Sequence, residues 1–307
     1  MKTVRIFLLS VVAALMASCG TTNTVPITGR KQNLLVNDEQ VLSLSNQQYQ
    51  EYMKTARLST DAANTAMVKR VGQRLANAVV TYLNSNGMGS EVSQYKWEFS
   101  LVQDNNVNAF CMPGGKIVVY DGLLPVTQNE ASLAIVLGHE IAHAVAKHSA
   151  ERLSNQVKQQ YSGQILGTVL NASGASSGLQ QAGAVVFGLG SSLGSAAYSR
   201  SQESEADHLG LVFAAMAGYD PQVAVSFWQR MASSSGGGSA SLFSDHPSDA
   251  TRIKNIQNWM PEAKKYYRPA NTTPAASFHF STKSSSNGAG INKNQGTMPT
   301  LHISNKK

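Results

Sequence analysis

The residues most able to do chemistry are two histidines four positions apart, His139 and His143, with Glu140 directly after the first. On an α-helix, positions i and i+4 lie on one face a turn apart, so both imidazoles can bind one metal ion. Glu140 lies about 100° further round the helix, where its carboxylate can reach a water molecule at the metal without binding the metal itself. The pattern therefore predicts a zinc site in which Glu140 is the general base.

A catalytic zinc needs a third protein ligand and an open position. The candidates that follow the motif are His148, Glu151, Glu203 and Glu205. The first two lie on what the apolar pattern predicts to be the same rigid helix as the motif, with no intervening glycine, so we exclude both as ligands. The third ligand is then expected from the acidic cluster after residue 200.

Within that cluster, Glu203 is favoured because Asp207 follows it by one helical turn on the same face. Asp207 can accept a hydrogen bond from the outer ring nitrogen of a ligating histidine and so fix its tautomer. Leu209 holds the corresponding position after Glu205 and cannot do this. We therefore predict one zinc ion per chain, bound by His139, His143 and Glu203.

Helices are the main elements predicted around this motif. Residues 127–130 read Thr-Gln-Asn-Glu, a capping-box pattern that predicts a helix from there to about residue 160. Apolar residues spaced by three and four predict further helices. These helices cover residues 37–83 with a second start near Asp61, 201–216, 221–231 and 247–260.

Three short β-like runs precede the motif. Residues 97–101 alternate between apolar and polar types, residues 107–112 lead into a Pro-Gly-Gly turn, and residues 116–120 are rich in β-branched types. They predict one small sheet or hairpin. The expected fold class is therefore α+β, mainly α with a small β-sheet, as a zincin-type catalytic domain over residues 37–268 organised by the motif helix.

Two small-residue segments lie near the predicted site. The Gly-, Ala- and Ser-rich stretch 161–198 predicts a pair of helices packed under the domain, with a membrane-dipping hairpin or a lid over the metal as the alternative. The loop 233–241 contains three consecutive glycines, and either segment could gate the site. Residues 269–307 are of low complexity and are expected to be disordered.

The N-terminal residues have the pattern of a bacterial lipoprotein leader. Lys2 and Arg5 precede an apolar stretch, residues 6–16, that is too short to span a bilayer. Small residues then precede Cys19. We expect residues 1–18 to be a signal peptide, Cys19 to carry a lipid, and residues 19–36 to form a tether, flexible over residues 20–24, and an extended arm.

A lipid at Cys19 would place the chain in the cell envelope, facing the periplasm. Gly20 follows the cysteine where aspartate would signal inner-membrane retention under enterobacterial sorting rules, so we expect the outer membrane. Cys111 is then the second and last cysteine, and no disulfide is expected. The formal charge is +7, but no run of Lys or Arg exceeds two residues, which excludes nucleic-acid binding.

Taken in order, these motifs resemble the gluzincin peptidases that include the CAAX prenyl endopeptidase, HtpX and the Oma-type proteases. The resemblance covers residues 26–260 and is nearest to the lipid-anchored periplasmic subgroup of the LoiP and BepA kind. The segments that carry it are 27–30, 108–110 with 113–115, 138–143, 199–207, and 246–247 with Arg252.

The resemblance implies the same three zinc ligands, Glu140 as general base and Asp207 behind the ligands. It further implies that His246 steadies the transition state and that Arg252 closes the same region. The strand entered through Asn108, Ala109 and Phe110 is expected to pair with the substrate backbone. Cys111 stands where the family often has a small or apolar residue, and it receives no role.

The expected function is zinc-dependent endoproteolysis of unfolded or misassembled envelope proteins, with the envelope assembly machinery as a candidate partner. An exposed strand edge reads the peptide backbone more than its side chains, which suits unfolded substrates. A latent protease, or a non-catalytic zinc lipoprotein acting as a chaperone or scaffold, is the alternative. An exopeptidase would need groups that bind a free chain end, and the sequence identifies none.

Overall fold

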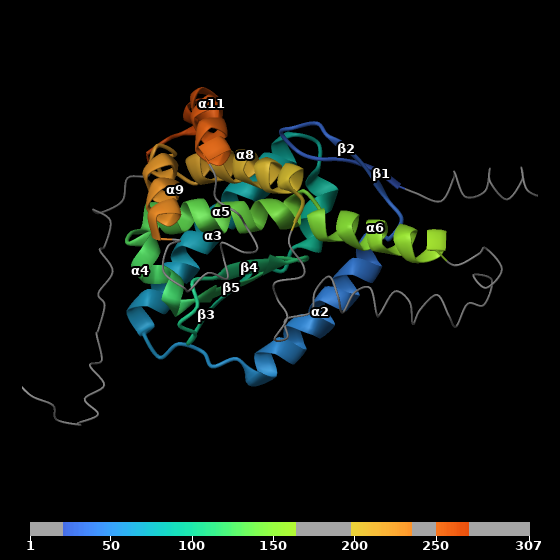
Figure 1. The fold of residues 1–307 in the computed structure, drawn as a ribbon, viewed down its shortest axis with the longest axis horizontal. Helices are drawn as coiled ribbons and strands as arrows, with labels where there is room; N and C mark the ends of the chain where they lie inside the picture. The colour runs from blue at the N-terminus through green and yellow to red at the C-terminus, as the bar shows by residue number, and fades with distance from the viewer. Residues whose placement is uncertain (1–20, 164–197, 235–249, 270–307) are drawn as a thin grey trace, which may run out of the picture.

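The computed structural model describes residues 21–163, 198–234 and 250–269 (Figure 1). Helices dominate these ranges and two small sheets accompany them, which confirms the mainly α, α+β fold class. Some predicted features lie outside the described residues. These are the leader 1–18, Cys19, His246, most of the 161–198 stretch, most of the 233–241 loop and nearly all of the tail 269–307.

The first described element is a β-hairpin. β1 (Thr21–Thr24) pairs antiparallel with β2 (Lys31–Leu34). Pro26 and Gly29, which the sequence marks as breakers, lie in the connecting turn, where Gly29 has a φ of +67°. The prediction of a flexible segment is therefore wrong for residues 21–24, because pairing with β2 orders them.

Two long helices follow, α2 (Asp38–Thr55) and α3 (Ala62–Ser85), and each starts where the sequence predicts a helix start. The Asn37 side chain accepts a hydrogen bond from the Gln40 N–H, and the Asp61 side chain accepts one from the Asn64 N–H. The apolar residues that predicted α3 are all fully buried. They are Val68, Val71, Leu75 and Val79.

The central sheet has the strand order β3-β5-β4, formed by Glu98–Val102, Lys116–Tyr120 and Ala109–Met112 respectively. β5 runs parallel to β3 and antiparallel to β4. The predicted hairpin is therefore β4–β5. Its turn contains Gly114 and Gly115, both with positive φ, a conformation that glycine adopts without strain. β4 forms an edge of this sheet.

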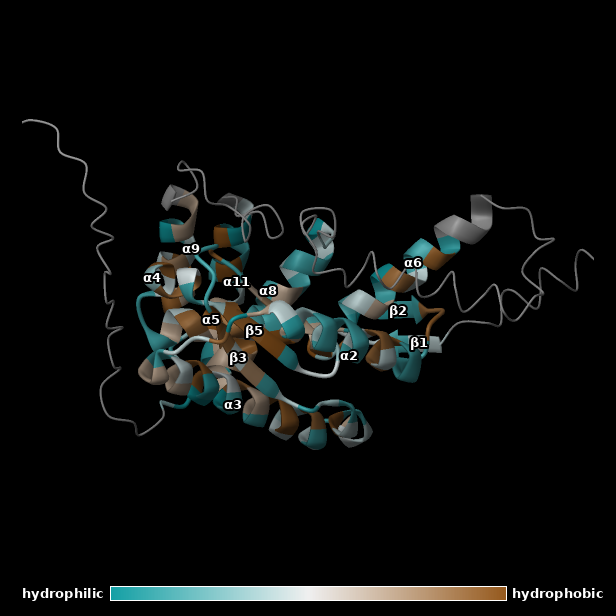
Figure 2. Cartoon of the chain, turned by 90° about the horizontal axis from the view of Figure 1, so that it is seen from below, coloured by the Kyte–Doolittle hydropathy of each residue, from teal (hydrophilic) through white to brown (hydrophobic). Residues whose placement is uncertain are grey.

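The sheet lies between α2 on one side and α5 with α8 on the other (Figure 1). On β5, Ile117 and Val119 face the larger core, which includes α3 and α5, whereas Val118 and Tyr120 face a smaller core with residues of α2. This alternation follows from the two-residue period of a strand. Figure 2 shows the apolar residues gathered on the strands and on the helix faces around them, with polar residues outside. The motif helix therefore packs against a buried apolar core that includes one face of the sheet.

The helix that bears the motif is shorter than predicted. α5 (Glu130–Val145) is capped by the Asn129 side chain, which accepts a hydrogen bond from the Ser132 N–H, and not by Thr127, which ends the short helix α4 (Leu124–Thr127). α6 (His148–Gly163) is a separate helix. One continuous helix to residue 160 is wrong because Lys147 adopts a left-handed φ of 52°, which interrupts the helical hydrogen bonding.

Three helices complete the described fold: α8 (Arg200–Met216), α9 (Val223–Ser234) and α11 (Ala250–Tyr266). α8 packs along α5, and α11 packs against α8 (Figure 1). Gly218 ends α8 as predicted, with a φ of +82°, whereas α11 continues through Pro261 beyond its predicted end. None of the described helices combines the length and the apolar character that crossing a membrane requires.

Candidate metal centre

The motif side chains lie buried on α5. His139, Glu140 and His143 have exposed fractions of 3%, 3% and 1%. The one-turn spacing brings the two imidazole rings to a centroid separation of 4.7 Å, and their Nε2 atoms lie 3.0 Å apart. Two ring nitrogens that face each other in a buried space can share a metal ion, because each then directs a lone pair at the metal.

Glu203 completes this group from the first turn of α8. Its Oε2 lies 3.4 Å from His139 Nε2, and its Oε1 lies 3.4 Å from His143 Nε2. Tetrahedral zinc with bonds of about 2.0–2.2 Å places ligand atoms roughly 3.3–3.5 Å apart. Both glutamate–histidine distances match this spacing, the two histidine nitrogens are slightly closer at 3.0 Å, and the donor types are those that zinc prefers. Among the described residues, these three side chains converge as a group that could hold a metal ion.

Asp207 and Arg252 lie behind His139. Asp207 Oδ1 is 2.8 Å from His139 Nδ1, and the Arg252 guanidinium donates to the same oxygen at 2.6 Å. Arg252 also stacks over the Trp228 ring, 3.4 Å from its centroid. Burial disfavours the charged imidazole, but hydrogen bonds to Asp207 and Glu203 outweigh it and raise the pKa of His139 to about 9. Asp207 contacts the Nδ1 side of this ring, so Nε2 is the nitrogen that faces Glu203 and the metal position.

Two glycines let α8 approach α5 closely enough for these contacts. A Cβ atom on Gly210 would lie 2.6 Å from the backbone nitrogen of His139, and one on Gly138 would lie 2.8 Å from the Gly210 carbonyl oxygen. Any larger side chain would push the helices apart. Gly210 is a functional position that the motif alone did not reveal. Its place three residues after Asp207 is the sequence feature that could have indicated the close contact between the helices.

His148 lies beside the centre, contrary to the argument that a rigid helix keeps it away. Because the backbone turns at Lys147, His148 Nδ1 comes to 2.8 Å from His143 Nδ1. Lys147 is held by ion pairs to Asp38 at 2.8 Å and Glu91 at 2.7 Å, which help to offset the strain of its conformation. His148 contacts the side of His143 that faces away from Glu203, so it supports this ring and does not join the three ligands.

Glu205, which the sequence analysis set aside, also has a defined place. Its Oε2 lies 3.0 Å from His148 Nε2 and accepts a hydrogen bond from Arg30 Nε, while its Oε1 accepts one from Thr28. Burial alone would raise its pKa, but the hydrogen bonds lower the pKa of Glu205 to about 2. Burial lowers the pKa of His148 and, strongly, that of His143, against the attraction of Glu205 and Glu203 respectively.

Tyr198 is a further neighbour that the sequence did not reveal. Its ring stacks on His143 with a centroid separation of 3.9 Å, and its hydroxyl lies 3.0 Å from the Ser149 Oγ. The Arg152 guanidinium lies over the Tyr198 ring, 4.7 Å from its centroid. The stacked ring restricts rotation of the His143 imidazole. An aromatic residue just before the Ser199 helix cap is the signal that could have suggested it.

The predicted substrate strand lies at the edge of the sheet next to α5. Ala109 and Phe110 belong to β4, and Asn108 precedes it, with its carbonyl accepting a hydrogen bond from the Tyr120 N–H. Within the described ranges, β5 is the only strand paired with β4. Cys111 is buried on this strand, and burial raises the pKa of its thiol. Among the described strands, β4 is therefore an edge strand.

The fold and the centre together define a class of protein. Two histidines one helical turn apart, a buried glutamate next to the first of them, and a carboxylate from a packed helix as the third ligand are the arrangement of a zincin-type metallopeptidase domain. The family model for peptidase family M48 matches residues 62–260, and the chain belongs to this family.

Individual relatives agree with this assignment. The chain is 36% identical over 177 residues to the mitochondrial metalloendopeptidase OMA1 of Schizosaccharomyces pombe, covering 57% of this chain and 50% of that protein. It is 29% identical over 226 residues to the metalloprotease LoiP of Escherichia coli, covering 73% and 82%. It is 27% identical over 234 residues to a putative beta-barrel assembly-enhancing protease of Vibrio cholerae, covering 75% and 46%. The matches span half or less of two of these three relatives.

Proposed function

We propose that this chain is a zinc-dependent metalloendopeptidase of the bacterial cell envelope. The observation that carries the proposal is the convergence of His139 Nε2, His143 Nε2 and the Glu203 carboxylate in a buried site beside Glu140. Three protein ligands are typical of catalytic zinc, whereas structural zinc usually has four. The family and the names of its relatives support peptide-bond hydrolysis.

The proposed chemistry divides the work among residues of this chain. When bound, zinc supplies a Lewis acid that activates water and polarises the scissile carbonyl. Glu140 accepts the proton of the attacking water and passes it to the leaving amine. Asp207 holds His139 in the ligating tautomer, and Arg252 keeps Asp207 in place. His246 is proposed to stabilise the oxyanion.

The proposed substrates are unfolded or misassembled envelope polypeptides. The outer side of β4, entered through Asn108, Ala109 and Phe110, is the proposed place where substrate adds as an extended strand. Backbone pairing of this kind accepts many sequences, which fits proteolytic quality control. The names of the LoiP and beta-barrel assembly-enhancing relatives support a role beside the envelope assembly machinery.

The proposed location rests on the N-terminal sequence. A lipid on Cys19 would hold the chain to the periplasmic side of a membrane, with Gly20 favouring the outer membrane. The mitochondrial relatives are as similar as the bacterial ones, so the leader is what favours the envelope. Membrane fractionation of the Cys19→Ala chain tests the anchor: the variant is expected in the soluble fraction, and continued membrane retention would contradict it.

The catalytic proposal is tested by zinc content and casein cleavage of the full chain, beside its Glu140→Gln variant. We expect one zinc per chain in both proteins and cleavage by the wild type alone. Cleavage by the variant at the wild-type rate would contradict the role of Glu140. Zinc without cleavage by either protein would contradict the peptidase and favour a zinc-binding scaffold, and absence of zinc would contradict the ligand set.

A further inference from the structure

A row of buried side chains extends from His143 away from the metal position. His143 Nδ1 lies 2.8 Å from His148 Nδ1, and His148 Nε2 lies 3.0 Å from Glu205 Oε2. His148 is fully buried, and Glu205 has an exposed fraction of 7%. The three residues come from α5, α6 and α8, so the row exists only when these helices are packed together.

The hydrogen-bond directions along this row follow from its far end. Glu205 sits between the Arg30 guanidinium, 2.8 Å from Oε2, and the Thr28 hydroxyl, 2.6 Å from Oε1. A carboxylate surrounded by donors accepts only, so His148 Nε2 must carry the proton that it donates to Glu205. His148 Nδ1 faces another ring nitrogen at 2.8 Å, so one of the two must accept, and with the His148 proton on Nε2 the acceptor is His148 Nδ1.

The same logic determines the state of His143. An acceptor at His148 Nδ1 requires a donor at His143 Nδ1, which leaves His143 Nε2 without a proton and free to bind a metal. We propose that Glu205 and His148 are positioning residues that fix the metal-binding tautomer of His143. Thr28 and Arg30 lie in the turn between β1 and β2 (residues 25–30, the N-terminal turn) and hold Glu205 in place. This inference rests on the metal site of the proposed function.

The N-terminal turn is built to present these two donors. The Thr28 N–H donates to the Pro26 carbonyl at 2.6 Å, which closes a three-residue turn with Ile27 at its centre. Ile27 has a φ of +65°, a strained conformation for a β-branched residue. Arg30 also forms a two-pronged ion pair with Glu151 at 2.7 and 2.9 Å. The surrounding contacts therefore hold the strained turn in one conformation.

Glu205→Gln tests the row of hydrogen bonds from Glu205 through His148 to His143, and Glu151→Gln is its matched control. Both changes remove one carboxylate bound to Arg30, but only Glu205 touches His148. In the metal-free full chain labelled with ¹⁵N-histidine, long-range ¹H–¹⁵N spectra are expected to show His143 protonated at Nδ1 in the wild type and in Glu151→Gln. In Glu205→Gln the Nδ1–H tautomer is expected to lose its dominance.

Zinc affinity, measured by competition with a chromophoric chelator, is the second readout. Loss of a residue that orients a metal ligand typically weakens affinity by about 10–100-fold, and we expect this for Glu205→Gln and not for Glu151→Gln. A second pair of variants keeps the inference testable if Glu205→Gln does not fold. His148→Leu is expected to lose the Nδ1–H tautomer, whereas His148→Gln, whose amide can both accept from His143 and donate to Glu205, is expected to keep it.

Two outcomes would overturn the inference. One is an unchanged His143 tautomer with unchanged zinc affinity in Glu205→Gln and His148→Leu. The other is an equal loss of zinc affinity in Glu151→Gln. This would show that the contacts of Arg30 with Glu151 and Glu205 act only by stabilising the fold. If the wild type bound no zinc, the proposed function would fail, but the His143 tautomer of the metal-free chain would still decide the inference.

Discussion

Each histidine at the centre has one ring nitrogen engaged by a buried partner, and the two partners differ. His139 Nδ1 lies 2.8 Å from the carboxylate of Asp207, whereas His143 Nδ1 lies 2.8 Å from the imidazole of His148. In both rings the engaged nitrogen points away from Glu203. On the Nδ1 side, a carboxylate therefore contacts His139 directly, whereas His143 is connected to the Glu205 carboxylate through the ring of His148. The groups that hold Asp207 consequently matter most for His139.

Arg252→Met tests the support of Asp207. Methionine keeps an apolar stem but removes the guanidinium that donates to Asp207 Oδ1 at 2.6 Å and stacks on Trp228. Removal of one partner of a buried ion pair leaves the other charge uncompensated, so we expect the free energy of unfolding to fall by about 3 kcal/mol. Denaturant titration of the metal-free chain measures this change.

A double variant provides the control for this prediction. In Arg252→Met combined with Asp207→Asn, no buried carboxylate is left uncompensated at this position. We expect the double variant to lose less stability than the sum of the two single variants, as is usual for residues in direct contact. Strictly additive losses would show that Arg252 stabilises the fold by its packing on Trp228 and not through Asp207.

At the scale of elements, the sequence predicts well whatever depends on local periodicity. The one-turn spacing places His139 and His143 on one helix face, and the spacing of Glu203 and Asp207 selects the carboxylate that the structure brings within 3.4 Å of both rings. The predicted helix starts at residue 37 and near Asp61 are equally local, because the Asn37 and Asp61 side chains each accept a hydrogen bond from a backbone N–H three residues on.

The break between α5 and α6 could not be predicted in this way. Lys147 is neither glycine nor asparagine, and its left-handed conformation is supported by Asp38 and Glu91, which are far away in the sequence. The roles of His148 and Glu205 depend on that break. A prediction from periodicity continues a helix until a local signal ends it. It therefore misses helix breaks that are stabilised by residues distant in the sequence.

Gly210→Ala tests the close packing of α8 on α5. The new Cβ would lie 2.6 Å from the His139 backbone nitrogen, so one helix must shift. We expect a loss of about 1–3 kcal/mol in stability, as for other overpacked sites. A loss of zinc affinity should accompany it, because Glu203 and Asp207 move with α8. Thermal unfolding and chelator competition measure the two effects.

Gly72→Ala is the matched control for this packing prediction. Gly72 lies in α3, where a Cβ would meet the Phe99 side chain at 2.1 Å, away from the metal ligands. We expect this variant to lose stability while its zinc affinity remains that of the wild type. Equal losses of affinity in both variants would show that zinc binding follows general stability and not the position of α8.

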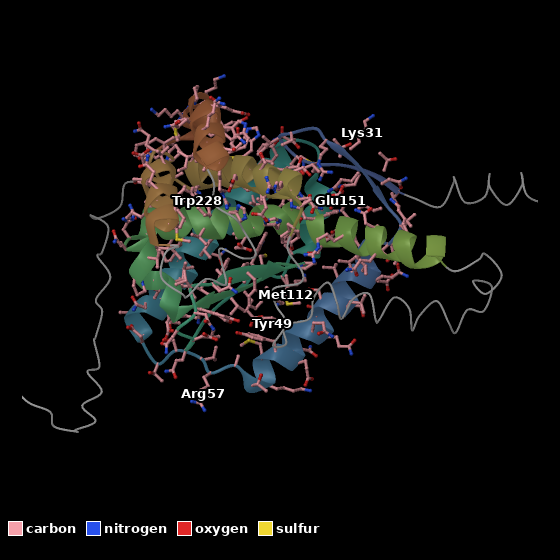
Figure 3. All side chains as sticks on the ribbon, in the orientation of Figure 1. Lys31, Tyr49, Arg57, Met112, Glu151 and Trp228 are labelled. Carbon is pink, nitrogen blue, oxygen red and sulfur yellow. The ribbon has the colours of Figure 1, made fainter. Side chains whose placement is uncertain are left out.

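At the scale of the whole molecule, the centre joins parts of the chain that are distant in sequence. Arg30 connects the N-terminal hairpin to Glu151 on α6 and Glu205 on α8, while Arg252 of α11 meets Trp228 of α9. Figure 3 shows Glu151 and Trp228 on different sides of the centre, and Trp228 lies beside His139 with a ring-centroid separation of 6.3 Å. Because the supports come from the N-terminal hairpin and from α6, α8, α9 and α11, the geometry of the ligands depends on the folded state of the entire domain.

Zinc binding should therefore stabilise the whole chain, since the ligand set from α5 and α8 exists only in the folded state. Free zinc at about 1,000 times its Kd adds about 4 kcal/mol of stability, and each kcal/mol raises Tm by roughly 2–4 °C in a domain of this size. Calorimetry with zinc and with chelator is then expected to differ by about 10 °C. The His143→Ala chain should show little shift, whereas an equal shift in that variant would place the stabilising zinc at another site.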